Sequence, residues 1–253
     1  MIDLYLVGIG TGNPDHLTRA AIKALDSADL ILLPRKGAGK SDLADLRRTI
    51  CAEVLSGAPN VAEFDLPQRD SREDYLSAVE DWHDAIAAVW AEAIARHLPQ
   101  GGKVAVMVWG DPSLYDSTLR IAAKLGAGGM ALRPHALPGI TSLQVLTAAH
   151  CIPLNDLGAS VLITTGRRLR DEGWPEGIAS VAVMLDAGGA FEALDPAGVE
   201  IWWGAYLGMA QECLIAGPLA AVGPQILQTR AELRARHGWI MDIYLMRRGR
   251  IPG

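Results

Sequence analysis

The strongest constraint on the fold is a pair of apolar runs near the start of the chain. The first covers residues 4–10 and ends in a glycine-rich turn; the second covers residues 29–33 and stops at Pro34. Between them, apolar residues recur at helical spacing over residues 16–27. Continuous apolar strands are typical of a parallel sheet buried on both faces, so this segment predicts a strand–helix–strand unit of an α/β fold.

The rest of the first half continues this alternation. Residues 40–98 are expected to be mostly helical, with one long helix after the capping-box pattern of residues 71–74. The glycines and proline of residues 99–102 end that helix. The further elements expected in this half are a strand over 103–109, a helix over 117–126, a strand over 130–137 and a helix over 142–149.

The second half has strands that follow one another without long helices between them. This order favours a mixed sheet, since antiparallel strands can be joined by short turns. We therefore expect two α/β domains, residues 1–140 with a largely parallel sheet and residues 141–253 with a mixed sheet. The elements expected here are strands over 160–165, 179–185, 199–203 and 240–247 and a helix over 224–236.

Charge and composition exclude several classes of protein. The formal net charge is −6, with 23 basic and 29 acidic residues, so the chain lacks the excess cations that nucleic-acid binding requires. No apolar stretch is long enough to span a membrane. The three cysteines, Cys51, Cys151 and Cys213, lie far apart, which argues against a disulfide scaffold or a metal site and favours a cytoplasmic protein.

Three strand-end turns carry the candidate chemistry: Gly-Ile-Gly-Thr-Gly-Asn at residues 8–13, Gly-Asp-Pro at 110–112 and Pro-Gly-Ile-Thr-Ser at 138–142. Ligands of open α/β sheets bind beyond the carboxyl ends of the strands. The first turn superficially suggests a dinucleotide site. However, Asn13 stands where the third glycine belongs, Pro14 follows it, and no acidic residue ends the second strand. A turn that only reverses the chain is the simpler alternative.

In this order and spacing, the three turns resemble those of the tetrapyrrole methylase family, which uses S-adenosylmethionine. The segments at residues 181–185, 203–205 and 217–219 resemble later motifs of the same family. The resemblance implies a two-domain fold that holds S-adenosylmethionine in the cleft between the domains. The cofactor contacts that it implies fall on Thr11, Trp109, Gly110, Asp111, Leu114, Thr141, Ser142, Met184, Gly204 and Ala205.

Within the family, residues 33–48 resemble a branch that acts on the corrin ring. Pro34 stands where the sirohaem-forming members carry an aspartate, which disfavours their reaction. The resemblance implies methylation of precorrin-5 at carbon 1, with loss of the acyl fragment as acetate, to give precorrin-6A. Loss of an acyl group by hydrolysis needs a base. The candidates by their placement near strand ends are Asp15, His16, Asp111 and Tyr115, and the sequence does not choose among them.

A precorrin substrate carries many carboxylates, so a net negative protein must recognise it through local cations. Guanidinium groups suit bidentate binding of carboxylates. The substrate-binding candidates near the end of the second strand are Arg35, Lys36, Lys40, Arg47 and Arg48. A solvated charged face is the alternative for this cluster and for a second one at residues 167–170. The family resemblance and the apolar stripe of the long helix also predict a homodimer.

Three other functions stay open from the residues alone. Another precorrin methyltransferase would act at a different ring carbon, a dinucleotide-dependent oxidoreductase would use the first glycine turn for NAD(P), and a tetrapyrrole-binding protein without activity would need no cofactor turns.

Overall fold

The computed structural model describes residues 1–35, 42–68 and 75–249, and for residues 42–44, 75 and 76 it describes the backbone alone. The chain divides into two compact units, Met1–Thr141 and Ser142–Gly253. Each has its own five-stranded sheet. The predicted α/β class is confirmed, with one parallel sheet and one mixed sheet.

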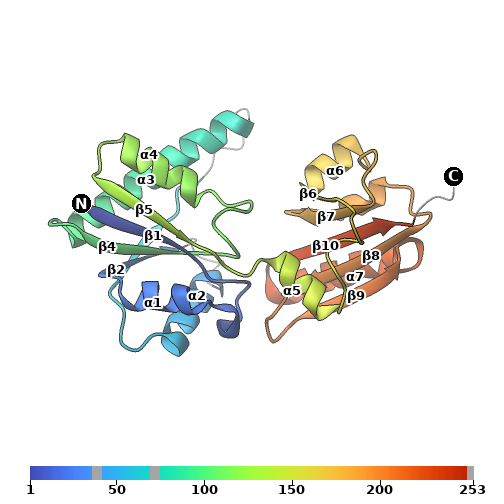
Figure 1. The fold of residues 1–253 in the computed structure, drawn as a ribbon, viewed down its shortest axis with the longest axis horizontal. Coiled ribbons are helices and arrows are strands. Elements are labelled where there is room, and N and C mark those ends of the chain that lie inside the picture. Colours follow the sequence, from blue (N-terminus) through green and yellow to red (C-terminus); the bar gives the residue numbers. More distant parts are fainter. Residues whose placement is uncertain (36–41, 69–74, 250–253) are drawn as a thin grey trace. The chain divides into compact units, whose positions relative to one another are not determined.

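The first unit is a parallel sheet with helices on both faces (Figure 1). Its strand order is β3-β2-β4-β1-β5, and every neighbouring pair is parallel. Helices α3 and α4 lie on one face and α1 and α2 on the other. The elements are β1 (Ile2–Gly8), η1 (Pro14–His16), α1 (Arg19–Asp26), β2 (Leu30–Arg35), α2 (Asp42–Val54), β3 (Val61–Asp65), α3 (Tyr75–His97), β4 (Gly102–Val108), α4 (Thr118–Ala127) and β5 (Leu132–Leu137).

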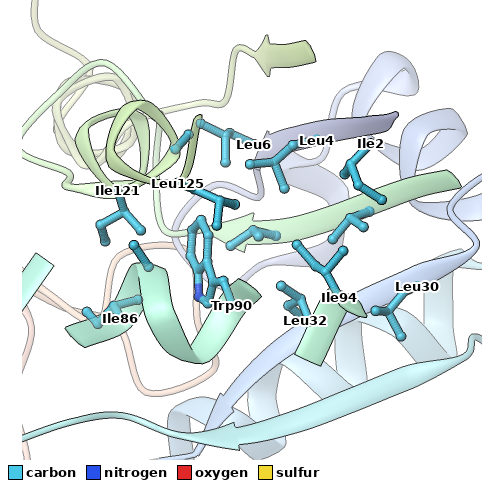
Figure 2. Close-up of a cluster of buried hydrophobic side chains, with 14 of the residues drawn as sticks. Ile2, Leu4, Leu6, Leu30, Leu32, Ile86, Trp90, Ile94, Ile121 and Leu125 are labelled. Atoms are coloured by element: carbon cyan, nitrogen blue, oxygen red, sulfur yellow. The ribbon is translucent and has the colours of Figure 1, made fainter. Parts of the chain in front are cut away.

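The long helix α3 packs its apolar stripe onto the sheet of its own unit. Figure 2 shows Ile86, Trp90 and Ile94 of this helix among the side chains of strands β1 and β2 and helix α4. Trp90 is almost completely buried. Burial of a large side chain of this kind stabilises a fold by about 2–3 kcal/mol. The stripe that suggested a homodimer is therefore used inside the unit, and a dimer would need another surface.

The expectation that residues 40–98 are mostly helical is wrong at one point, because β3 lies between α2 and α3. In this strand Ala62 and Phe64 are buried while Glu63 and Asp65 face away from the core. The strand has only five residues, two of which are polar, and it lies at the edge of the sheet. Its alternating pattern is therefore too short to stand out beside two helices.

The second unit contains the mixed sheet, with strand order β6-β7-β10-β8-β9. Strands β6 and β7 are parallel and the other neighbouring pairs are antiparallel. Helix α5 covers part of one face, while α6 and α7 pack on the apolar cluster of the other. The elements are α5 (Ser142–Ala149), β6 (Val161–Thr165), α6 (Gly166–Glu172), β7 (Ser180–Met184), η2 (Ala190–Ala193), β8 (Val199–Ala205), β9 (Cys213–Pro218), α7 (Leu219–His237) and β10 (Asp242–Arg248).

Two elements and two helix starts differ from the sequence-based expectations. Helix α6 and strand β9 are not expected from the sequence; α6 is only two turns long, and β9 is an edge strand that contains Gly217. Helix α7 begins at Leu219 rather than near residue 224, so Pro224 lies inside the helix, where a proline removes one backbone hydrogen bond. Helix α1 begins at Arg19, three residues later than expected. Within the described ranges, no helix is long and apolar enough to cross a membrane.

The core of the first unit contains a buried imidazole, which leads to a prediction about pH. His83 of α3 is buried, and neither ring nitrogen has a hydrogen-bond partner among the described residues. Burial lowers its pKa, and Lys124 and Arg120 add to this effect against the attraction of Glu80 and Asp84. The folded protein therefore binds a proton at His83 less readily than the unfolded chain does.

We predict that the free energy of unfolding falls as the pH is lowered through about 6.5, the ordinary pKa of histidine. The His83→Leu variant should lose this dependence, and at pH 7.5 it should be at least as stable as the wild type because no unpaired nitrogen is buried. Urea unfolding of both proteins at pH 5.5 and 7.5 measures this. An equal loss of stability in both proteins at pH 5.5 would show that His83 does not cause it.

Candidate functional site

In the first unit, the three predicted turns meet at the carboxyl edge of the sheet. They follow β1, β4 and β5, which are neighbours in the sheet and run in the same direction. The first two turns are joined by backbone hydrogen bonds. The Gly110 amide donates to the Gly10 carbonyl at 2.8 Å, and the Gly10 amide donates to the Gly110 carbonyl at 3.4 Å.

Glycine at these turns is required by the close approach of three backbones. A Cβ atom on Gly139 would lie 2.0 Å from the carbonyl oxygen of Gly110 and 2.8 Å from the carbonyl carbon of Gly8. A Cβ atom on Gly8 would lie 2.6 Å from the Gly139 nitrogen. Contacts this short do not occur for real side chains, so only glycine lets the ends of β1, β4 and β5 converge in this way.

Asp111 fastens the second turn to the third. Its carboxylate accepts hydrogen bonds from the Gly139 amide at 2.9 Å and from the Ser113 amide at 2.8 Å, and a further one from the Ser113 hydroxyl. Partial burial by itself would raise the pKa of Asp111, but these hydrogen bonds outweigh it and hold the pKa below its ordinary value. Asp111 is therefore ionised and joins the second turn to the third, a connection that we call the latch. Its low pKa makes it a weak base.

Next to this latch, the side chain of Trp109 is covered by a buried cation. The Arg47 guanidinium from α2 lies 4.8 Å from the centre of the Trp109 ring, and its Nε donates to the Met107 carbonyl at 3.4 Å. Burial lowers the pKa of Arg47 to about 10, against the attraction of Asp116, so the guanidinium stays charged at neutral pH. The indole N–H of Trp109 is buried with no hydrogen-bond partner within the described ranges.

The other side chains of this edge are more exposed. Tyr115 is 43% exposed and has a φ of 49°, a left-handed conformation that is uncommon for a residue other than glycine. Leu114 is half-buried, and Ile140 in the third turn is 36% exposed. Thr141 lies directly beside Gly110, since a Cβ atom on Gly110 would be 3.8 Å from the Thr141 Cα. The edge thus combines backbone glycines, a carboxylate and accessible apolar side chains.

The first turn differs from a dinucleotide-binding turn. Gly10 packs against His16, whose Nδ1 lies 3.3 Å from the Thr11 hydroxyl. The chain then forms η1, and α1 begins only at Arg19, where Thr18 caps it by accepting from the Ala21 amide. A dinucleotide site needs the helix to start at the glycine turn, so that its N-terminus faces the pyrophosphate. Of the base candidates, the half-buried His16 lies at this turn, and Asp15 beside it is exposed.

In the second unit, the predicted cofactor residues also lie at one sheet edge. Strands β7 and β8 are both antiparallel to β10, so their carboxyl ends share an edge. Met184 ends β7, and Gly204 and Ala205 end β8. A Cβ atom on Gly204 would lie 2.6 Å from a methyl group of Leu207 and 2.9 Å from one of Leu146, so a side chain here would displace both leucines. Ser142 is the first residue of α5.

Asp186, which follows Met184 by two residues, is a buried acidic residue that no sequence motif indicates. Its buried carboxylate accepts from the Tyr244 hydroxyl at 2.7 Å and from the Ala190 amide at 2.6 Å. In the sequence, Asp186 is an acidic residue just after an apolar strand. An ordinary exposed turn residue has the same position, so the sequence does not indicate its burial.

The predicted basic cluster divides into separate groups. Arg35 and Arg48 both form ion pairs with Glu63, and each has a second acidic partner, Asp65 for Arg35 and Asp45 for Arg48. Arg47 instead points into the protein, toward Trp109. Lys36 and Lys40 lie outside the described residues.

The chain is similar to known proteins along its whole length. Residues 3–223 match the family model described as tetrapyrrole (corrin/porphyrin) methylases. A precorrin-6A synthase [deacetylating] from Sinorhizobium sp is 47% identical over 252 residues, which cover 98% of this chain and 96% of that protein. A precorrin-2 C(20)-methyltransferase from Sinorhizobium sp is 32% identical over 66% of this chain and 69% of that protein.

Two solved structures have the same fold. A cobalamin synthesis related protein (CobF) from Corynebacterium diphtheriae superposes with a TM-score of 0.84 at 38% identity, covering 98% of this chain and 99% of that one. A uroporphyrin-III C-methyl transferase from Thermus thermophilus, complexed with S-adenosylhomocysteine, has a TM-score of 0.61 at 18% identity and covers 96% of both chains. At that identity the second likeness concerns the fold alone.

The glycine contacts of the carboxyl edge lead to a prediction about stability. In Gly139→Ala, the new methyl group collides with the Gly110 carbonyl, so the two turns must move apart and the protein should lose about 1–3 kcal/mol. The matched control is Gly126→Ala in α4, where a Cβ atom meets nothing within 4 Å. This variant should gain up to about 1 kcal/mol from helix propensity. Urea unfolding measures both, and equal stability of the two variants would contradict the close approach.

Proposed function

The chain belongs to the tetrapyrrole (corrin/porphyrin) methylase family, and we propose that it methylates precorrin-5 at carbon 1 with S-adenosylmethionine and releases the acyl fragment as acetate, giving precorrin-6A. It is a methyltransferase of cobalamin biosynthesis. The observation that carries the finer assignment is the 47% identity over nearly all of both chains to a precorrin-6A synthase [deacetylating]. The convergence of three glycine turns at one sheet edge supports a ligand site there, independently of that identity.

The residues of both edges fit S-adenosylmethionine. The ligand has hydroxyl groups that need acceptors, an amino acid part that needs polar partners, and a carbon-rich adenosyl group. Glycine turns let a ligand approach the backbone closely, and Leu114 and Met184 offer apolar contact. The proposed contacts are Thr11, Trp109, Gly110, Asp111, Leu114, Thr141, Ser142, Met184, Gly204 and Ala205. The glycine turn is not followed by a helix N-terminus, which disfavours a dinucleotide.

Methyl transfer requires little from the protein besides orientation. When bound, S-adenosylmethionine supplies an activated methyl group on a sulfonium. The protein must hold the nucleophilic ring carbon in line with that group, and such positioning accounts for much of the rate of a reaction between two bound molecules. The latch of Asp111 on Gly139 fixes two of the three turns before ligands arrive, so little ordering remains to be done on binding.

Loss of the acyl group needs a water molecule and a proton acceptor. Water adds to the acyl carbonyl, the carbon–carbon bond to the macrocycle breaks, its electron pair stays with the macrocycle, and acetate leaves. The proposed base is one of Asp15, His16, Asp111 and Tyr115. The low pKa of Asp111 disfavours it as the base. The phenol of Tyr115 is exposed at the sheet edge. His16 has an imidazole next to the Thr11 hydroxyl, which makes it the first of the four to test.

The carboxylates of the precorrin are proposed to bind Arg35, Lys36, Lys40, Arg47 and Arg48. Of these, Arg47 would have to leave the Trp109 ring to reach a carboxylate. Arg35 and Arg48 already share Glu63, so a substrate carboxylate would have to compete with that acidic residue. A homodimer and a cytoplasmic location remain part of the proposal.

The direct test is incubation of the purified protein with precorrin-5 and S-adenosylmethionine, followed by mass spectrometry of the tetrapyrrole and assay of acetate. We expect one methyl group gained, one acetyl group lost and one acetate released per turnover. Methylation without acetate would instead indicate a precorrin methyltransferase that acts at another ring carbon. Failure to methylate any precorrin would contradict the proposal.

The latch gives a prediction about cofactor binding. In Asp111→Ala, the second and third turns lose their connection, and affinity for S-adenosylhomocysteine should fall at least tenfold, which is about 1.4 kcal/mol. Isothermal titration calorimetry measures this. The matched control is Asp195→Ala, which removes another turn carboxylate, one that accepts from the Ala197 amide just before β8. If both variants bind as the wild type does, Asp111 does not belong to the site.

A further inference from the structure

The turn after β7 contains an exposed apolar residue in a strained conformation. Leu185 is 67% exposed, and its φ of 53° puts it in the left-handed region. A leucine adopts this conformation only where the surrounding structure enforces it, and such residues cluster at functional sites. Leu185 directly follows Met184, which is one of the proposed cofactor contacts, at the carboxyl edge of the sheet.

The next residue, Asp186, enforces the conformation. Its side chain is only 2% exposed, and four groups donate to its carboxylate. They come from two helices, a strand and the turn itself: the Tyr244 hydroxyl at 2.7 Å, the Ala190 amide at 2.6 Å, the Gly188 amide at 3.1 Å and the Arg170 guanidinium at 3.3 Å. A carboxylate held from so many directions fixes the backbone of the residue before it.

The backbone of Asp186 is held as well. The Arg230 guanidinium from α7 donates to the Asp186 carbonyl at 3.0 Å, and its Nε donates to Asp242 at 2.9 Å. Asp242 also accepts from the Trp203 indole at 3.0 Å. The turn after β7 is therefore tied to the start of β10, to α7 and to β8, which ends at the same sheet edge.

Gly166, the first residue of α6, leaves the space that the carboxylate occupies. A Cβ atom on Gly166 would lie 2.4 Å from the Asp186 Cγ and from its Oδ1. A methyl group at residue 166 would therefore displace the carboxylate while leaving its charge and every donor in the protein. This offers a way to disturb the turn that is independent of removing Asp186.

We propose that Asp186 is a positioning residue for the cofactor: it holds Leu185 in the left-handed conformation, so that Met184 faces the adenosyl group of S-adenosylmethionine. The proposal rests on the proposed function. The ligand follows from the chemistry, since the apolar side chain of Met184 at the strand end suits the carbon-rich part of a ligand and not its charged amino acid part.

The first experiment measures the Kd for S-adenosylhomocysteine by calorimetry in Asp186→Asn and Gly166→Ala. Both variants should bind at least tenfold more weakly than the wild type. The control is Gly223→Ala in α7 of the same unit, where a Cβ atom lies no closer than 3.5 Å to its neighbours. It should bind within twofold of the wild type. Wild-type affinity in folded Asp186→Asn and Gly166→Ala would overturn the proposal.

Circular dichroism and thermal unfolding establish that each variant folds. If Asp186→Asn does not fold, Tyr244→Phe replaces it, because this variant keeps the aromatic ring in the core and removes only one donor. Its Kd should rise less, by about threefold, and no change would overturn the proposal.

A second substitution separates positioning from a general structural role. Asparagine adopts the left-handed conformation far more readily than leucine does. In the Asp186→Asn background, Leu185→Asn should therefore recover part of the lost affinity, at least threefold, although it adds no contact to Asp186. A general loss of structure would not be reversed at residue 185, so failure to recover affinity would overturn the conformational explanation.

The wild-type titration distinguishes failure of this inference from failure of the proposed function. If the wild type does not bind S-adenosylhomocysteine, the proposed function itself fails. If the wild type binds it and the variants bind equally well, only the role of Asp186 is wrong.

Discussion

The first unit depends on the convergence of three backbones at the carboxyl edge of its sheet. Gly8, Gly110 and Gly139 approach so closely that a single methyl group at residue 139 would overlap the Gly110 carbonyl. This approach is possible only because β1 lies between β4 and β5 and all three strands are parallel. Asp111 then fixes the arrangement by accepting from the Gly139 amide. The candidate site is thus built before a ligand binds.

In the second unit, a buried side chain fixes the turn at the sheet edge. After β7, the buried carboxylate of Asp186 accepts hydrogen bonds from α6, β10 and the turn. It fits there because Gly166 has no side chain. Both edges therefore combine glycine for close approach with an aspartate that fixes a loop. The two aspartates differ in exposure, since Asp111 is partly buried and the Asp186 side chain is almost completely buried.

Much of this organisation could be predicted from the sequence because it depends on local patterns. The apolar runs predicted the strands of the parallel sheet, the short turns between strands predicted the mixed sheet, and the order of the three turns predicted the family. Strand β3 was missed because five residues at a sheet edge have too little periodicity. The role of Asp186 could not be predicted, since its donors Tyr244 and Arg170 are distant in the sequence and only the fold brings them together. By contrast, helix geometry alone predicts that Arg47 and Arg48 separate, since adjacent helical residues point in different directions.

We propose that the protein binds S-adenosylmethionine and not a dinucleotide. Calorimetric titration of the wild-type protein with S-adenosylhomocysteine, with NADPH as the comparison ligand, tests this. We expect a Kd in the micromolar range or tighter for S-adenosylhomocysteine and no binding of NADPH. Binding of NADPH without binding of S-adenosylhomocysteine would contradict it, and the glycine turn at residues 8–13 would then be a dinucleotide site of unusual geometry.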